Sequence, residues 1–437
     1  LNIKVIEGEK EAYYGGVAAL NLLHDNTFIT MDIGGGSTEF SFIRDGKIEK
    51  SISLNIGTVR IKELFFNKDD IEGAKKNILD NLKKIFELGI EIPKKVVGIG
   101  GSIRAFSKIV MAKNDYPLDI LHGYTYNVKD EVSLFNKIIN ARNNDDLKSV
   151  GVKKDRFDTI KEGTFIFKTI LDELNIKEVV TSGVGVREGV YLTDLLRNSN
   201  HKFPENFNVS VRSLLDRFQI DEKQSAYLGS NAGKIFDVLK PMHNLDDKFR
   251  TLLVIASKLH SIGSTLNFYK SNDNAFDFIL NGLNYDFLHT SRVVVAHTIK
   301  FSKKSLPSKS DILKYQELLP SLEVMQWMSF MISLNIAINQ DLSRPKVEYV
   351  LNNNTLEINL SNKSFLIETN IETYRFRDAL FAVIDLARDG NKYLQEKEPW
   401  KKGDNQIAID NCLHLSLQLC ANLAIFTVFS LCAVCLV

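Results

Sequence analysis

The feature that most constrains the fold is a glycine-rich turn between two apolar segments. Residues 28–33 read Phe-Ile-Thr-Met-Asp-Ile, three glycines follow at 34–36, and apolar alternation resumes at Phe40 and Phe42. Alternating or short apolar runs bounded by glycines are typical of strands joined by a tight turn. The pattern therefore predicts a strand, a glycine turn and a second strand at the centre of a sheet-containing domain.

The residues of this turn favour the binding of a phosphate. Gly34, Gly35 and Gly36 carry no Cβ, so their backbone N–H groups can approach a ligand closely, and Ser37 and Thr38 add hydroxyl donors. Concave arrays of N–H groups bind anions, above all phosphates. An ordinary glycine-rich hairpin turn is the alternative.

Two acids flank the turn and point to a metal. Asp32 precedes the glycines and Glu39 follows them, so both are placed to hold a hard cation or to orient a water molecule. A phosphate beside carboxylates implies Mg²⁺, because the metal bridges groups that would otherwise repel each other.

Composition excludes several classes of function. The 55 Lys and Arg residues balance 54 Asp and Glu residues, so no overall field favours nucleic acid or an anionic membrane. All four cysteines lie near the end of the chain, at Cys412, Cys420, Cys432 and Cys435. The preceding body therefore has no disulfide, thiolate zinc site or cysteine nucleophile, which suits a cytosolic protein.

The chain begins with Leu1 in an apolar alternating run, and no signal peptide is visible, so we expect a fragment that starts within a domain. A strand is predicted at 2–6, followed by a helix through Leu23. The acids at the start of this helix, which include Glu11, suit the helix macrodipole, and capping alone would explain them.

After the glycine turn, residues 40–53 predict a hairpin whose turn is Asp45-Gly46. A long amphipathic helix is expected to follow Arg60 and to end near Gly89. Arg60 could bind a phosphate bidentately, and a surface arginine is an equal alternative.

Two later segments repeat the sequence of buried strand, glycine turn and helix. The strands are predicted at 95–99 and 178–182. Such junctions direct N–H groups and helix N-termini at phosphates or a nucleotide. The candidate phosphate-binding residues at these two junctions are Gly100, Gly101, Ser102 and Arg187.

Strands that alternate with helices predict an α/β domain over residues 25–197, with ligands at the strand ends. A polar linker at 198–208 is followed by a mainly helical domain at 209–400, which carries a small β-hairpin and a helix at 374–388.

The tail at 401–437 is apolar, and residues 419–437 are long enough to resemble a membrane span. A tail anchor is one interpretation, and a segment of different origin, such as a frameshifted end, is the other.

Four motifs occur in a recognisable order. They are the 6–17 run, the 32–39 turn, the 98–102 glycine pair and the 187–190 segment. Over about residues 2–400 the chain thereby resembles the exopolyphosphatase / guanosine pentaphosphate phosphohydrolase family. The resemblance implies an actin-like, Hsp70-like ATPase fold, in which two related α/β domains face each other across a cleft and a helical domain follows. It also implies Mg²⁺-dependent removal of terminal phosphate from polyphosphate or conversion of pppGpp to ppGpp.

The resemblance also assigns roles to residues. The catalytic glutamate of the family lies in a Gly-x-x-Glu-Ala context, which here makes Glu11 the inferred general base that activates water. Asp32 and Glu39 resemble the acids that hold Mg²⁺ and position water. The backbone from Gly34 to Thr38 would hold the substrate phosphate.

The sequence departs from the family at its start. The first phosphate motif of the family, an Asp-x-Gly-Ser-Asn-Ser turn, is absent together with most of the first lobe, so residues 1–24 are interpreted as its remnant. We expect this chain to be impaired or inactive without the facing lobe, because substrate phosphate would lack one set of donors.

A second departure lies in the helical domain, which in some relatives resembles HD phosphohydrolases. His260 is kept, but Ser261 stands where a metal-binding Asp would be, so we expect a packed core histidine and no metal. The domain is expected to bind long substrate or form a dimer contact. Lys300, Lys303 and Lys304 could line a polyanion path, although a solvated face is the default interpretation.

The sequence thus predicts a cytoplasmic, homodimeric, Mg²⁺-dependent phosphoanhydride hydrolase that acts on polyphosphate or guanosine penta/tetraphosphate. It predicts no nucleic-acid partner, and a membrane only if the tail is native. The alternatives are an ATPase or kinase of the same fold and a regulator that binds these compounds without turnover. Substrate preference stays open.

Overall fold

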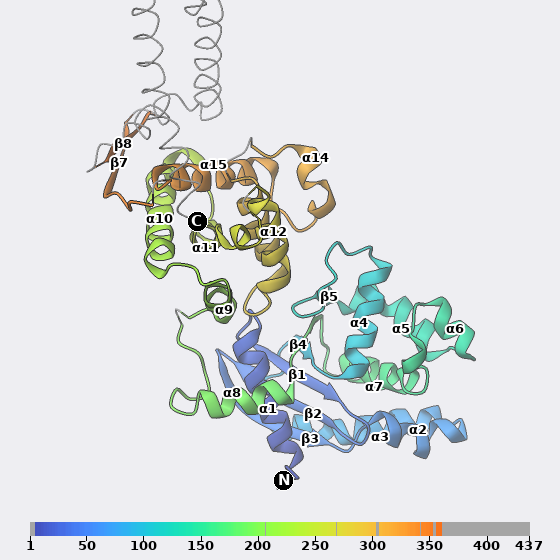
Figure 1. Ribbon diagram of the computed structural model, residues 1–437. Helices are drawn as coiled ribbons and strands as arrows, with labels where there is room; N and C mark the ends of the chain where they lie inside the picture. Colours follow the sequence, from blue (N-terminus) through green and yellow to red (C-terminus); the bar gives the residue numbers. More distant parts are fainter. Residues whose placement is uncertain are drawn as a thin grey trace, which may run out of the picture. The chain divides into compact units, whose positions relative to one another are not determined.

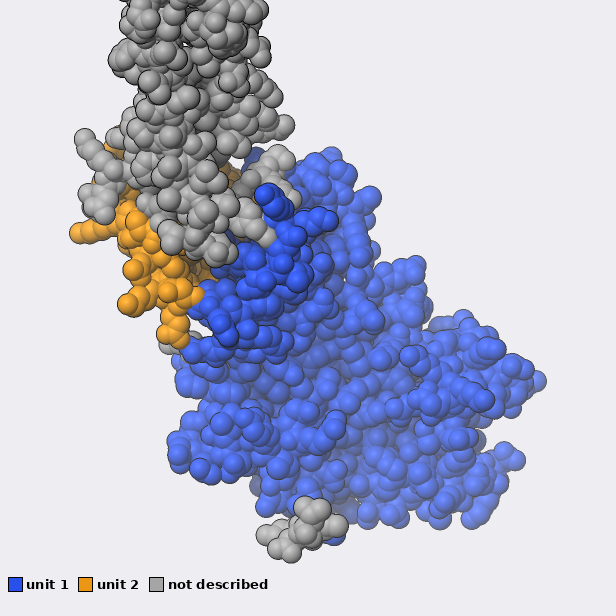
Figure 2. All heavy atoms as spheres, viewed as in Figure 1, with its two compact units in different colours: residues 1–220, 259–301, 306–326 blue, residues 221–258, 302–305, 327–437 orange. Residues whose placement is uncertain are grey.

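The computed structural model describes residues 5–205, 207–267, 269–302, 306–340, 342–352 and 355–360. The chain divides into two compact units (Figure 2). Unit 1 comprises Leu1–Ile220, Leu259–Phe301 and Leu306–Gln326, and unit 2 comprises Asp221–Lys258, Ser302–Ser305 and Trp327–Val437. The predicted linker at 198–208 lies inside unit 1. The predicted domain bounds stay predictions.

Figure 1 labels the helices and strands. The strands are β1 (Phe28–Ile33), β2 (Thr38–Arg44), β3 (Lys47–Leu54), β4 (Lys95–Gly98), β5 (Thr125–Asn127), β6 (Glu178–Thr181), β7 (Val347–Asn352) and β8 (Thr355–Leu360). The helices up to residue 220 are α1 (Gly8–Leu22), α2 (Thr58–Leu64), α3 (Ile71–Phe86), α4 (Gly101–Lys113), α5 (Val132–Ile139), α6 (Asn144–Ser149), α7 (Ile160–Glu173), α8 (Val186–Leu195) and α9 (Val209–Arg217). The later helices are α10 (Glu222–His243), α11 (Asp247–Leu259), α12 (Ser271–Gly282), α13 (His289–Lys300), α14 (Lys309–Ile312) and α15 (Leu322–Ile338).

A mixed sheet forms the centre of unit 1, with strand order β3-β2-β1-β4-β6-β5. The first three strands are antiparallel, and β1, β4 and β6 are parallel to one another. The carboxyl ends of parallel strands lie at the same edge of a sheet, so the turns after β1, β4 and β6 come together there. The fold is therefore mixed α/β, as the sequence predicted.

Helices cover both faces of this sheet. Side chains at alternate positions, such as Met31 and Phe40, pack with α3, α4 and α7 in the larger core. The opposite face is covered by α1 and α8, which pack on each other (Figure 1). That face carries Asp32 and Glu39, so α1 is the helix that covers the two acids.

Several predicted elements are confirmed. The glycine turn joins β1 to β2, and the hairpin turn has positive φ at Asp45 (47°) and Gly46 (71°), as its Asp-Gly sequence favours. The junctions β4 to α4 and β6 to α8 also form, and β7 pairs with β8 in the small terminal hairpin.

Other predictions were wrong. The long helix after Arg60 is two helices, α2 and α3, because Asp69 adopts a left-handed conformation and the Asp70 side chain caps α3 by accepting from the Gly73 amide. The strand predicted at 2–6 does not form at Val5 and Ile6, and its other residues lie outside the described ranges. Strand β5 was not predicted.

Some predictions cannot be compared with the structure. The helix at 374–388, the tail with its four cysteines, and Lys303 and Lys304 all lie outside the described residues. Across the described ranges, no helix combines the length and the apolar character needed to cross a bilayer. His260 is half-buried and directly follows the last residue of α11.

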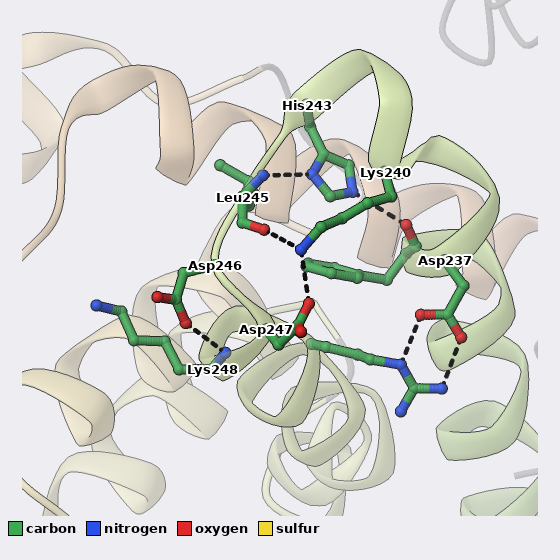
Figure 3. A network of polar contacts seen from close by, with 9 residues as sticks. Asp237, Lys240, His243, Leu245, Asp246, Asp247 and Lys248 are labelled. Atoms are coloured by element: carbon green, nitrogen blue, oxygen red, sulfur yellow. Dashed lines mark hydrogen bonds and ion pairs between the residues drawn. The ribbon is translucent and has the colours of Figure 1, made fainter.

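Unit 2 contains a polar network at the turn between α10 and α11 (Figure 3). The Arg250 guanidinium donates two hydrogen bonds of 2.7 Å to the Asp237 carboxylate, and Lys240 pairs with Asp247. The His243 Nδ1 accepts from the Leu245 amide, so its Nε2–H donates to the Phe236 carbonyl. These bonds stabilise the turn between the two helices.

A glycine sets the spacing of α1 and α8. A Cβ at Gly189 would lie 1.8 Å from the Tyr14 carbonyl oxygen, so α8 can approach α1 only without a side chain there. We expect Gly189→Ala to lower the free energy of unfolding by about 1–3 kcal/mol, the usual effect of overpacking. Urea unfolding measures this. Gly36→Ala is the matched control, because its Cβ would meet nothing within 4 Å. Equal unfolding midpoints for the two variants would contradict the account.

Candidate active site

The glycine turn places two acids side by side. In the antiparallel pair of β1 and β2, Asp32 lies directly opposite Glu39. Cross-strand partners project from the same face of a sheet with Cβ atoms about 4.5–5.5 Å apart. The two carboxylates predicted to hold Mg²⁺ therefore project from one face, next to the turn.

The turn is open on its amide side. The Gly34 amide donates to the Ser37 carbonyl at 3.0 Å, which closes the turn. Within the described ranges, the amides of Gly35 and Gly36 donate to no protein acceptor, and both residues are exposed. Because a Cβ at Gly36 would meet nothing within 4 Å, an anion has room to reach these amides.

Helix α2 holds the turn from its other side. The Thr58 and Val59 amides donate to the carbonyls of Gly34 and Gly35 at 3.0 and 2.9 Å. Gly57 permits this approach, because a Cβ there would lie 2.3 Å from the Gly35 carbonyl oxygen. Since the carbonyls face α2, the amides face away from it.

Arg60 and Thr38 also support the turn. The Arg60 Nε donates to the Gly36 carbonyl at 3.0 Å, and its guanidinium is otherwise exposed at the rim. The buried Thr38 hydroxyl donates to the Ile56 carbonyl. Contact of Arg60 with a phosphate stays a prediction, and the Thr38 hydroxyl is occupied by the protein backbone.

Small residues on α1 bring Glu11 to the acids. A Cβ at Gly8 would lie 2.5 Å from the Ser53 Cβ, and one at Gly16 would lie 2.8 Å from the Ser41 Cβ. Helix α1 therefore lies unusually close to β2 and β3. Glu11 follows Gly8 by three residues, so the two share a helix face. The predicted general base is thus on the face of α1 that meets the sheet.

The three acids influence one another. Burial raises the pKa of Asp32 to about 6, with the nearby charge of Arg104 opposing this rise and that of Glu11 adding to it. Burial also raises the pKa of Glu39, which accepts hydrogen bonds from Ser37 and Ser53 and is repelled by Glu11 and Asp32. The acids thus form one electrostatic cluster.

The described residues contain no group of three or more acidic, His or Cys side chains that could enclose a metal ion. This arrangement still fits Mg²⁺, which is usually bound through one or two carboxylates together with substrate phosphates and water. Asp32 and Glu39 are therefore suited to share the metal with a phosphate.

The second junction contacts the first. A Cβ at Gly100 would lie 2.5 Å from the Asp32 Oδ1, so this glycine lets the acid lie against the start of α4. Gly101 opens α4, and the Arg156 guanidinium lies 3.0 Å from where its Cβ would be. Ser102 packs against Gly163 of α7. The N-terminus of α4 therefore has a cation beside it.

Arg104 links the second and third junctions. Its Nε donates to the Ser182 carbonyl at 2.8 Å and its guanidinium also donates to Val184. The charges of Asp32, Arg187 and Arg156 all act on Arg104. The exposed Arg187 of α8 thus belongs to a group of cations at the strand ends.

Sequence reasoning missed Arg104 and Arg156. The sequence contained an indication for Arg104, because this residue lies in the first turn of a helix that follows a glycine pair. Arg156 lies more than fifty residues from Gly101 along the chain, so only the fold brings the two together.

Arg156 is an exposed cation beside the N-terminus of α4, where we expect it to bind a polyanion, although it also pairs with Asp155 at 3.7 Å. We expect Arg156→Met to raise the KM roughly tenfold or more, the effect of losing a charge-assisted hydrogen bond. Steady-state kinetics on a polyphosphorylated substrate measure it. Arg142→Met, which removes an exposed arginine elsewhere, is the control, and an equal KM for both variants would refute this role.

The amino-acid sequence is similar to a family of phosphatases over its first 198 residues. Residues 1–198 match the model of the Ppx/GppA phosphatase family. The chain is 28% identical over 288 residues to a guanosine-5'-triphosphate,3'-diphosphate pyrophosphatase of Vibrio campbellii, and 25% identical over 325 residues to one of Photobacterium profundum. These matches cover 62% and 70% of the chain but 54% and 61% of the relatives, so the chain spans little more than half of their length.

A third relative is a bifunctional 3-dehydroquinate synthase/phosphatase of Fusobacterium nucleatum, 32% identical over 196 residues that cover 42% of this chain and 29% of the relative. Among solved structures, an Aquifex aeolicus member of the Ppx/GppA family is 28% identical, covers 46% of this chain and 66% of its own, and has a TM-score of 0.39. The matched residues 1–198 contain all four sequence motifs and the three acids. Through them, residues 1–198 are similar to the Ppx/GppA phosphatase family.

Proposed function

We propose that the protein is a Mg²⁺-dependent hydrolase of terminal phosphoanhydrides, acting on inorganic polyphosphate or converting pppGpp to ppGpp. The observation that carries this proposal is the pairing of free amides at Gly35 and Gly36 with the acids Asp32 and Glu39 on the adjoining strands. Two relatives are named for a guanosine-triphosphate-diphosphate substrate, which supports the same class.

In this mechanism the turn binds the terminal phosphate through its amides. Asp32 and Glu39 would hold Mg²⁺, which neutralises phosphate charge when bound. Glu11 takes the proton from the attacking water, and its charge acts on both Asp32 and Glu39, which places it near them. The cations Arg104, Arg156 and Arg187 balance the charge of the rest of a polyanion.

The actin-like fold, with a facing first lobe, belongs to the same proposal. The turns after β1, β4 and β6 open at one edge of the sheet, which is the edge where ligands bind in open α/β sheets. The helical domain, the homodimer and the cytoplasmic location stay predictions of the sequence.

A substrate comparison tests the proposal. Phosphate release from pppGpp, polyphosphate and ATP should be measured with Mg²⁺ and with EDTA. We expect release from pppGpp or polyphosphate that stops with EDTA and that is slow, as predicted above for a chain without the facing lobe. Release from ATP alone, or transfer of its phosphate to an acceptor, would favour the ATPase or kinase alternative. Tight pppGpp binding without release would favour a regulator.

A further inference from the structure

A buried arginine in unit 1 makes no hydrogen bond or ion pair with the described residues. Arg292 of α13 is 0% exposed and is the largest fully buried side chain among the described residues. Its Nε, Nη1 and Nη2 atoms make no hydrogen bond. No carboxylate in the described ranges lies within ion-pair distance of it. Buried charges in proteins are almost always paired, so this guanidinium needs a counter-charge.

The polar groups around Arg292 are neutral and already occupied. The His122 Nδ1 accepts from the Gly183 amide at 3.0 Å, so its Nε2–H donates to the Leu22 carbonyl at 2.7 Å. In the same way, the His289 Nε2–H donates to the His122 carbonyl at 3.0 Å. Its Nδ1 therefore accepts the Tyr116 hydroxyl proton at 2.8 Å.

The charge of Arg292 acts on each of these groups. Burial and Arg292 together lower the pKa of His122 and of His289 to about 4, so both imidazoles are uncharged at neutral pH. Burial raises the pKa of Tyr116, which keeps it protonated. Burial lowers the pKa of Arg292 itself to about 10, so it stays charged. None of these neighbours can supply a negative charge.

Asp286, which precedes α13, and Glu317, whose charge acts on Tyr116, do not pair with Arg292. Asp286 accepts from Asn208 and pairs with His24, and Glu317 is exposed. The start of α13 offers donors instead, because Leu288 gives it no side-chain cap. Helical side chains lean toward the N-terminus, so Arg292, four residues into α13, is directed at this first turn. By this rule the guanidinium is expected on the side of the first amides of α13.

We propose that Arg292 and the first turn of α13 form a buried site for one small inorganic anion, of the size of chloride or orthophosphate. The guanidinium supplies the charge and the helix N-terminus supplies further donors. Thr290 in that first turn is exposed, so the first turn of α13 reaches the protein surface. This site is independent of the proposed hydrolase activity.

Thermal unfolding at constant ionic strength tests the site. Sodium gluconate, whose anion is too large to enter, is replaced stepwise by sodium chloride or by sodium phosphate. For the wild type we expect Tm to rise by about 5 °C as a saturating anion is added, as for any ligand that binds only the folded state. Comparing the chloride titration with the phosphate titration shows which of the two anions the site binds.

Variants show whether Arg292 is responsible. Arg292→Met should lose the rise in Tm, and it should still fold, because an apolar side chain suits a buried position. Arg250→Met removes an exposed, paired arginine and should keep the rise. A crystal soaked in sodium bromide should show an anomalous peak next to the guanidinium. No peak at Arg292, or an equal rise in Tm for Arg292→Met, would overturn the proposal.

Discussion

Replacing Glu11 by Gln is expected to reduce phosphate release by roughly 10²–10⁴-fold, the usual contribution of a general base. The change keeps the size of the side chain and removes only its ability to take a proton. Polyanion binding should persist, because the amides of Gly35 and Gly36 and the cations at the strand ends are unchanged. Phosphate release and isothermal titration with tripolyphosphate measure the two effects separately.

Glu9 provides the control for this experiment. It lies on the same helix two residues earlier, is exposed, and does not face β2. Glu9→Gln should therefore release phosphate at the wild-type rate. A Glu11→Gln protein with undiminished release, or a Glu9→Gln protein with an equal loss, would remove Glu11 from the role of base.

The second large effect is the loss of folding stability that accompanies ionisation of the buried Asp32 carboxyl group. Burial raises its pKa from 3.8 to about 6, so the folded state holds the proton more tightly than the unfolded state. The stabilisation is complete below pH 3.8 and is lost as the pH rises through 6. At 1.36 kcal/mol per pKa unit, the loss is roughly 3 kcal/mol.

Asp32→Asn should remove this loss, because the amide never ionises. The free energy of unfolding of the variant, relative to the wild type, should therefore rise between pH 4 and pH 7, while phosphate release is abolished. Urea unfolding across this pH range measures the difference. Asp119→Asn, at an exposed position, is the control and should follow the wild type. A variant that loses stability at pH 7 would show that Asp32 is structural.

A stabilising and inactivating substitution is the expected signature of a functional acid. Asp32 lies opposite Glu39 and near Glu11, and such a cluster opposes folding unless a cation is bound. Mg²⁺ should therefore raise the stability of the wild type at neutral pH and have less effect on Asp32→Asn.

The local parts of this site could be predicted from the sequence. The turn at 34–36 follows from three glycines between two apolar runs, and the register of β1 and β2 then places Asp32 opposite Glu39. Each depends on residues less than ten positions apart, where spacing and side-chain period determine the geometry. The hairpin at Asp45-Gly46 was predictable for the same reason.

The parts that could not be predicted depend on contacts between residues distant in sequence, or on competition between helix propensity and side-chain capping. Arg156 lies in a short 3-10 helix, Lys154–Arg156, and only the tertiary fold brings it to Gly101. Helix propensity favoured one helix after Arg60, but the capping side chain of Asp70 starts a new one. That Arg292 has no carboxylate partner among the described residues could not be predicted either, because the sequence does not show which acids the fold brings near it.

Crystallography of the Glu11→Gln protein with tripolyphosphate and Mg²⁺ tests the central claim most directly. The account predicts a terminal phosphate held by the Gly35 and Gly36 amides, with the metal between it and Asp32 or Glu39. A phosphate bound away from these amides, or a residue 11 side chain directed away from them, would contradict the account.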